Sequence, residues 1–278
     1  MRLVVQGPAI TTPHLAHIHL LCGTSVQFVQ IAQHGYYLAN QSINPAVQQF
    51  CAEQHIDCAY VDDGALLENF GLCVMDMDST LISIECIDEI ADMVGIKPQV
   101  AAITERAMQG ELDFAQSLRE RVALLKGLTE ADLMRVLNER LQLNPGAKEW
   151  IEACKKHHIT TLLVSGGFTF FAERVKAMLG LDYAVSNTLE IIDGKLTGRV
   201  LGDIVDAQRK ANELTKLRDY LGLSARQTIA IGDGANDLKM MAEAGVGIAY
   251  HAKPVVQAQA SHALNHVGLD GVINLFTT

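Results

Sequence analysis

The sequence has few basic residues and no long apolar run. Its 278 residues carry 22 Lys and Arg against 32 Asp and Glu, so the formal net charge is −10 at pH 7. This balance argues against a general binder of nucleic acids or membrane surfaces. No apolar stretch is long enough to span a bilayer, and the apolar run at the start is too short for a signal peptide. We therefore expect neither nucleic acid nor membrane as a partner.

Closely spaced cysteine pairs are also missing. The six cysteines include no C-x-x-C pair, and several lie in apolar runs. We interpret them as reduced core thiols, which favours a cytoplasmic protein. What the sequence does have is a hydrophobic fraction of 49%, enough for a sizeable core in one large domain or two smaller ones.

Residues 1–62 have a pattern of their own. Strands are predicted at 3–6, 25–32, 36–40 and 57–61, and helices at 13–21 and 44–55. This βαββαβ order is that of a small ferredoxin-like α+β domain, which we place at residues 1–65. By element order alone it resembles an ACT-type module, a class that often binds amino acids or dimerises. An effector site, a homodimer contact and a plain structural extension all stay open.

Residues 66–278 alternate short apolar strands with helices, which predicts a doubly wound parallel sheet of the Rossmann-like α/β class. Strands are expected at 71–75, 160–164, 228–231 and 246–249, and a hairpin at 189–200. Between the first two strands, helices are predicted at 87–94, 99–109, 114–126 and 131–141. Their polar faces are typical of a helical bundle. Inserted after the first strand, at about 85–145, this bundle fits a cap that excludes water and selects substrate.

The stretch Gly71–Leu81 ends an apolar strand in two carboxylates, Asp76 and Asp78, followed by Ser79 and Thr80 in a turn. Open α/β sheets bind ligands at this edge. Two like charges so close repel, so either one is protonated or a cation holds both. Mg²⁺ is the natural candidate, because it takes hard oxygen ligands and commonly bridges carboxylate to phosphate. The alternative is an Asp-rich turn that caps the next helix.

Three later stretches add to this motif. An apolar strand ends in a predicted turn, Ser165-Gly166-Gly167. Lys210 stands alone at a predicted helix start, and the strand Thr228–Ile231 runs into Gly232-Asp233-Gly234-Ala235-Asn236-Asp237. Each alone is weak, since a lone helical Lys is usually solvated. In this order they resemble the haloacid dehalogenase superfamily of phosphatases, from roughly Gly71 onward, and most closely the members that act on phosphoserine.

The resemblance implies a mechanism for phosphoryl transfer. Asp76 would attack phosphorus and form an aspartyl phosphate, and Asp78 would protonate the leaving serine oxygen and then accept a proton from water. Lys210 would neutralise the developing charge. Mg²⁺ would be bound by Asp76 and Asp233 and by the main-chain carbonyl of Asp78, with Asp237 near the ion and in contact with it through water.

The resemblance also implies the substrate contacts. Ser165, Gly166 and Asn236 would hold the phosphate. Glu85 would pair with the ammonium, and Arg121 with the carboxylate through its bidentate fork, with Arg119 as rival. Met108 and Phe114 would line the apolar side.

The implied reaction is hydrolysis of O-phospho-L-serine to L-serine and phosphate, the last step of serine biosynthesis. The alternatives are a phosphatase or phosphotransferase for another small phosphorylated amino acid or alcohol, and a non-catalytic amino-acid sensor.

Overall fold

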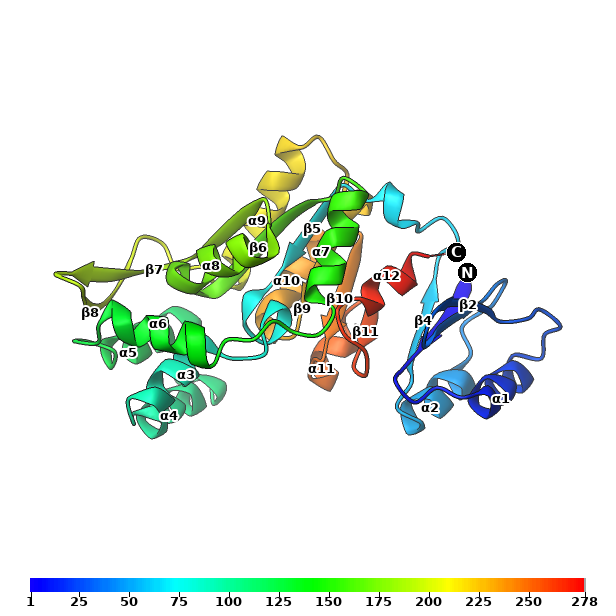
Figure 1. Cartoon of the computed structure of the whole chain (residues 1–278), viewed down its shortest axis with the longest axis horizontal. Helices are drawn as coiled ribbons and strands as arrows, with labels where there is room; N and C mark the ends of the chain where they lie inside the picture. Colours follow the sequence, from blue (N-terminus) through cyan, green and yellow to red (C-terminus); the bar gives the residue numbers. More distant parts are fainter. Residues whose placement is uncertain (278) are drawn as a thin grey trace.

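The computed structural model describes residues 1–277 and contains two separate sheets. A four-stranded antiparallel sheet lies at one end of the elongated molecule, close to both termini, and a seven-stranded sheet forms the body (Figure 1). Among residues 1–277, no helix has the length and apolarity needed to cross a membrane.

The N-terminal sheet has the order β2-β3-β1-β4, which is the predicted ferredoxin-like arrangement. Its elements are β1 (Arg2–Gln6), α1 (Thr12–Cys22), β2 (Val29–Ala32), β3 (Gly35–Leu38), α2 (Pro45–Glu53) and β4 (Asp57–Val61). The predicted strand at 25–32 is wrong in its first half. There the carbonyl of Val26 accepts a hydrogen bond from His19 Nε2 at 2.7 Å, and its N–H donates to Thr24 Oγ1. These side-chain bonds take the place of a sheet ladder.

The large sheet confirms the predicted doubly wound core, with the order β11-β10-β9-β5-β6-β7-β8. Its strands are β5 (Leu72–Met75), β6 (Thr160–Phe168), β7 (Tyr183–Ile192), β8 (Lys195–Leu201), β9 (Thr228–Gly232), β10 (Val246–Tyr250) and β11 (His262–Leu264). All neighbours pair in parallel except β7 and β8, which form the predicted hairpin with longer arms. The sequence pattern missed β11, whose three residues are too few to show a period.

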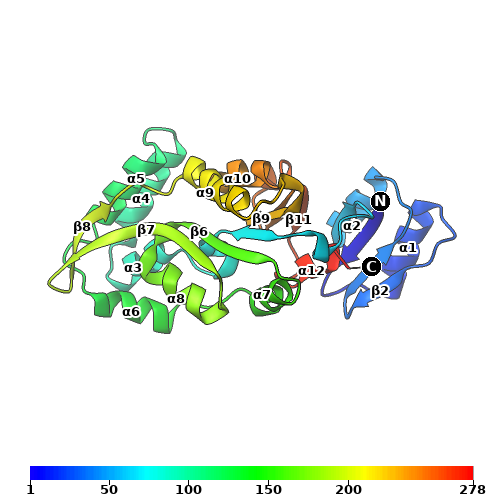
Figure 2. The ribbon, with the colours of Figure 1, turned by 90° about the horizontal axis from the view of Figure 1, so that it is seen from above.

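Four helices between β5 and β6 lie together at one end of the molecule (Figure 2). They are α3 (Cys86–Met93), α4 (Lys97–Met108), α5 (Phe114–Ala123) and α6 (Glu130–Glu139). The β7–β8 hairpin reaches out to them, and Leu196 exchanges backbone hydrogen bonds with Gly127 and Leu128 at 2.8 and 2.7 Å. The helical insertion is thus supported by a hairpin arm of the core.

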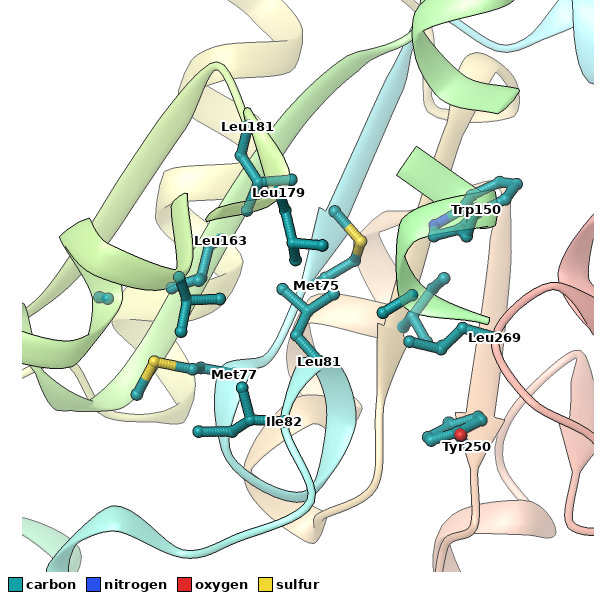
Figure 3. Close-up of a cluster of buried hydrophobic side chains, with 14 of the residues drawn as sticks. Met75, Met77, Leu81, Ile82, Trp150, Leu163, Leu179, Leu181, Tyr250 and Leu269 are labelled. Atoms are coloured by element: carbon teal, nitrogen blue, oxygen red, sulfur yellow. The ribbon is translucent and has the colours of Figure 1, made fainter. Parts of the chain in front are cut away.

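The remaining helices cover the large sheet. They are α7 (Ala147–Lys156), α8 (Thr169–Leu179), α9 (Ala207–Tyr220), α10 (Leu238–Glu243), α11 (Pro254–Gln257) and α12 (Gly271–Leu275). One face of β5 packs Met75 in a cluster with Leu163 and Trp150 (Figure 3). The other packs Val74 with Leu214 of α9. Both faces are therefore buried, as expected for a parallel sheet.

The N-terminal sheet is attached to the body by polar contacts and by a shared apolar cluster, in which Val4 and Val61 are buried together with Leu275. The carboxylate of Asp57 accepts hydrogen bonds from the backbone N–H groups of Asn265, His266 and Val267 at 2.8 to 3.2 Å. Arg2 Nη2 donates to the carbonyl of Leu275 at 2.9 Å. Because Arg2 and Asp57 are both buried, these bonds fix the two sheets to each other.

Candidate active site

Asp76 continues the direction of β5 beyond its last residue. Its backbone is extended, with φ −69° and ψ 164°, and its N–H donates to the carbonyl of Ile231 at 3.0 Å. Because side chains alternate along an extended chain, Asp76 lies on the same face as Val74, which packs with Leu214 of α9. Lys210 lies one helical turn before Leu214. The alternation therefore brings the carboxylate of Asp76 to this ammonium.

Lys210 is almost completely buried, with only 1% of its surface exposed, although a lone lysine on a helix is usually solvated. Its Nζ lies 2.8 Å from Asp76 Oδ2 and 2.8 Å from Asp237 Oδ1. Burial alone lowers the pKa of Lys210, but the charges of Asp237 and Asp76 outweigh it and raise the pKa above its usual value. A fixed positive charge is thereby held directly beside Asp76.

Three carboxylates gather at the ends of β5 and β9. One oxygen each of Asp76, Asp233 and Asp237 lies within 4.8 Å of the others. Burial and the charge of Asp237 raise the pKa of Asp233 to about 6 and that of Asp76 well above its usual value, where Lys210 opposes the shift. Hard oxygen donors that repel one another fit a Mg²⁺ ion, which would relieve this repulsion.

Asp78 stands apart from this acidic cluster, in the tight turn Met77–Leu81. Burial and the charge of Glu85 raise the pKa of Asp78 to about 7. A carboxyl group with this pKa is suited to donating and accepting a proton near neutral pH. Ser79, at φ 55°, donates a hydrogen bond from Oγ to Glu85 Oε1 at 2.7 Å, which joins the turn to the start of the cap.

The predicted turn at Ser165-Gly166-Gly167 is wrong, because these residues continue β6. The register with β7 shifts between Val164 and Phe168, and Ser165 Oγ accepts a local hydrogen bond from the N–H of Gly167 at 2.8 Å. A Cβ on Gly167 would lie 2.8 Å from Asp78 Oδ2. A larger residue here would displace the Asp78 carboxylate, so glycine serves close approach rather than a turn.

A cavity of about 700 Å³ opens above these groups, between core and cap. The predicted site residues that line it are Asp76, Asp78, Glu85, Met108, Phe114, Arg121, Ser165, Gly166, Asp233 and Asn236. Lys210 and Asp237 are buried beneath its floor. Core and cap meet closely at one point, since a Cβ on Gly166 would lie 2.8 Å from Phe114 Cζ.

The two candidate arginines on the cap differ in position and burial. Arg121 lines the cavity and is half-buried, whereas Arg119 is exposed and does not line it. Burial lowers the pKa of Arg121, and the charges of Asp88 and Glu85 oppose this shift. Met108 lies at the rim, with 68% of its surface exposed.

Several contacts at the site could not be read from the sequence. Thr80 Oγ1 donates to Asp233 Oδ1 at 3.0 Å, and Asn187 Nδ2 donates to the carbonyl of Gly166 at 2.8 Å. His251 and Lys253 line the cavity from the loop after β10. Their place depends on which strands are neighbours, and a local pattern does not contain that information.

With this geometry established, comparisons with known proteins are informative. Residues 73–242 match the family of haloacid dehalogenase-like hydrolases. A phosphoserine phosphatase from a Polaromonas species is 55% identical over 214 residues, which cover 75% of this chain and 91% of the relative.

Solved structures agree with this match. An unliganded probable phosphoserine phosphatase from Vibrio cholerae superposes with a TM-score of 0.87 at 41% identity, covering 99% of this chain and 86% of that one. A phospho-aspartyl intermediate analogue of phosphoserine phosphatase gives a TM-score of 0.70 at 39% identity, covering 75% of this chain and 99% of the other. The chain therefore belongs to the haloacid dehalogenase-like hydrolases, in the branch formed by the phosphoserine phosphatases.

Proposed function

We propose that this protein is a Mg²⁺-dependent phosphomonoesterase that hydrolyses O-phospho-L-serine to L-serine and phosphate. The observation that carries the proposal is Lys210, buried beneath the floor of the cavity with its Nζ 2.8 Å from a carboxylate oxygen of Asp76 and of Asp237. A buried cation beside a strand-end carboxylate suits an anionic intermediate formed on that carboxylate. The names of the relatives add the substrate.

The first half of the reaction is assigned to Asp76 and Asp78. A carboxylate oxygen of Asp76 attacks phosphorus, and the bond between phosphorus and the serine oxygen breaks. Asp78, whose pKa is raised to about 7, gives its proton to the leaving serine oxygen. Lys210 remains beside Asp76 and offsets the added negative charge.

In the second half, Asp78 takes a proton from the water that attacks the aspartyl phosphate. This releases phosphate and restores both carboxyl groups to their starting states. Mg²⁺ held by Asp76 and Asp233 would supply positive charge to the phosphate oxygens. Asp237 suits a supporting role, because its two oxygens already accept hydrogen bonds from Lys210 Nζ and the N–H of Gly234.

The two ends of the substrate are assigned to core and cap. The core side holds the phosphate through Ser165, Gly166 and Asn236. On the cap side, Glu85 pairs with the ammonium and Arg121 with the carboxylate. Both of these charged residues line the same cavity as Asp76, which supports the assignment.

Phosphate release from phosphoserine, phosphothreonine and p-nitrophenyl phosphate tests the proposal. We expect phosphoserine to be the best substrate, EDTA to stop turnover and Mg²⁺ to restore it. Measuring phosphate and serine together distinguishes hydrolysis from transfer to an added alcohol. A preference for another phosphate ester, or full activity after thorough chelation, would contradict the proposal.

A further inference from the structure

The carboxyl ends of neighbouring parallel strands place one residue at the cavity that the mechanism above does not use. β10 pairs in parallel with β9, and β9 pairs in parallel with β5. The chain leaving β5 carries Asp76, the chain leaving β9 carries Asp233, and the chain leaving β10 carries Lys253. All three line the same cavity.

The backbone of Lys253 is fixed, but its side chain is available. Lys253 precedes α11, and its carbonyl accepts hydrogen bonds from the N–H groups of Val256 and Gln257 at 2.9 and 3.1 Å. Pro254 follows, which suits the first position of a helix. The side chain is exposed, and within residues 1–277 its ammonium has neither an ion pair nor a hydrogen bond.

The charges around the cavity make such a cation useful. Asp76, Asp78, Glu85 and Asp233 all line it, in a protein whose formal net charge is −10. The Lys210 ammonium is already paired with Asp76 and Asp237. Among the described residues, two Lys or Arg side chains line the cavity. They are Arg121 from the cap and Lys253 from the core. Mg²⁺ held by Asp76 and Asp233 would offset part of this negative charge, and Lys253 adds a positive charge on the core side that no carboxylate of the described residues already pairs with.

We propose that Lys253 is the cation that captures the phosphate group of the substrate at the core side of the cavity mouth, before the phosphate reaches Asp76. The assignment to phosphate rather than carboxylate follows from position. Lys253 lies on the core, next to the strand that leads to Asp233, whereas Arg121 is on the cap. The inference rests on the proposed phosphatase function and adds a residue that sets the rate of substrate association.

The chemistry of lysine suits this role. An ammonium on a flexible four-carbon stem is a compact, hydrated point charge, which attracts an anion without fixing its orientation. Such attraction acts on association and is screened by salt, because the Debye length falls from about 30 Å at 0.01 M to about 3 Å at 1 M ionic strength. Lys253 should therefore affect kcat/KM much more than kcat.

The experiment compares Lys253→Met, Lys253→Arg and Lys156→Met in the full chain. Lys156 is an exposed lysine at the end of α7, just before β6 begins and so at the opposite edge of the sheet. Steady-state rates are measured on phosphoserine and p-nitrophenyl phosphate over a range of ionic strengths. For Lys253→Met we expect kcat/KM to fall about threefold to tenfold on both substrates at 10 mM ionic strength, with the difference vanishing near 0.5 M.

The other variants sharpen the result. Lys253→Arg should retain the wild-type rate and its salt dependence, and Lys156→Met should behave as wild type. Unchanged rates for Lys253→Met at low salt would overturn the inference, as would a loss confined to phosphoserine or a loss in kcat that salt does not affect. Because p-nitrophenyl phosphate is included, Lys253 is tested even if phosphoserine proves not to be the preferred substrate.

Discussion

Replacing Arg121 with alanine provides the sharpest test of how the cavity selects its substrate. The terminal nitrogens of Arg121 have no hydrogen-bond partner within residues 1–277, and only Nε is engaged, donating to the carbonyl of Ser117 at 3.3 Å. The planar fork is thus available for a carboxylate, which it matches in a bidentate manner. Arg121 lines the cavity on the cap side, opposite the groups that would hold phosphate.

The size of the effect follows from burial. Loss of one partner of a buried charge pair costs about 2–5 kcal/mol, and the half-buried position of Arg121 favours about 2–3 kcal/mol. Since 1.4 kcal/mol is about a factor of ten, kcat/KM for phosphoserine should fall about 30-fold to 150-fold. p-Nitrophenyl phosphate has no carboxylate, so its kcat/KM should change little.

The same helix supplies the matched control. Arg119 lies two residues away and therefore on a different face of α5, where it is exposed. Arg119→Ala removes the same chemical group from the same helix and should leave both substrates unaffected. Both variants are assayed for phosphate release over a range of substrate concentrations, and their thermal unfolding is compared with wild type.

Three results would refute this reasoning. Equal losses on both substrates would mean that Arg121 serves the fold or the phosphate. No loss on either would mean that its fork does not bind substrate. A loss with Arg119→Ala that matches the loss with Arg121→Ala would transfer the role to the exposed residue.

Three further predictions follow from other parts of the molecule. Asp76→Asn should abolish turnover without unfolding the chain, and rapid quench should trap a phosphoenzyme only in the wild type; substantial turnover by the folded variant would exclude Asp76 as nucleophile. A chain starting at Asp63 should keep phosphatase activity but melt at a lower temperature, because Arg2 and Asp57 no longer bind the C-terminal segment; a folded, inactive product would show that the first residues complete the site. Burial lowers the pKa of His262 to about 4, so its contribution to stability is complete above about pH 6.5 and is lost as the pH falls towards 4, by about 3 kcal/mol in total. Urea unfolding at pH 7 and 4.5 should show this loss in the wild type and not in His262→Gln, and an equal pH dependence in both would refute it.

Much of the site could be predicted because the strands of a parallel sheet all run from the amino end to the carboxyl end in the same direction. Each motif followed an apolar run, and the carboxyl ends of neighbouring parallel strands meet at one edge. The fold class therefore places Asp76 and Asp233 at the same edge of the sheet, and the pairing of β5 with β9 brings them together. The two glycines near the end of β6 were recognised as important, but their conformation was not, because local sequence does not show that Asp78 Oδ2 occupies the space beside Gly167.

Positions that depend on strand order and long-range packing could not be predicted from the local sequence pattern, and Lys210 was identified only through the family resemblance. Lys210 has the local pattern of a surface lysine, and its burial depends on α9 packing on the β5 face that carries Asp76. Asn187 and Lys253 come from β7 and from the loop after β10, whose places beside β6 and β9 are set by long-range packing. The ACT-type resemblance and the homodimer stay predictions, because element order fixes a fold and not a ligand.

The cap and the acidic cluster are mechanically connected through one short segment, residues 80–82. The chain enters and leaves the cap where Ile82 pairs with Leu143, and Asn144 Nδ2 donates to the carbonyls of Thr80 and Ile82 at 2.8 and 3.1 Å. Thr80 Oγ1 in turn donates to Asp233 Oδ1 at 3.0 Å. Any hinge motion of the cap at this crossing therefore acts on the segment that positions Asp233. These bonds form a continuous set of contacts from the entry of the cap to the acidic cluster.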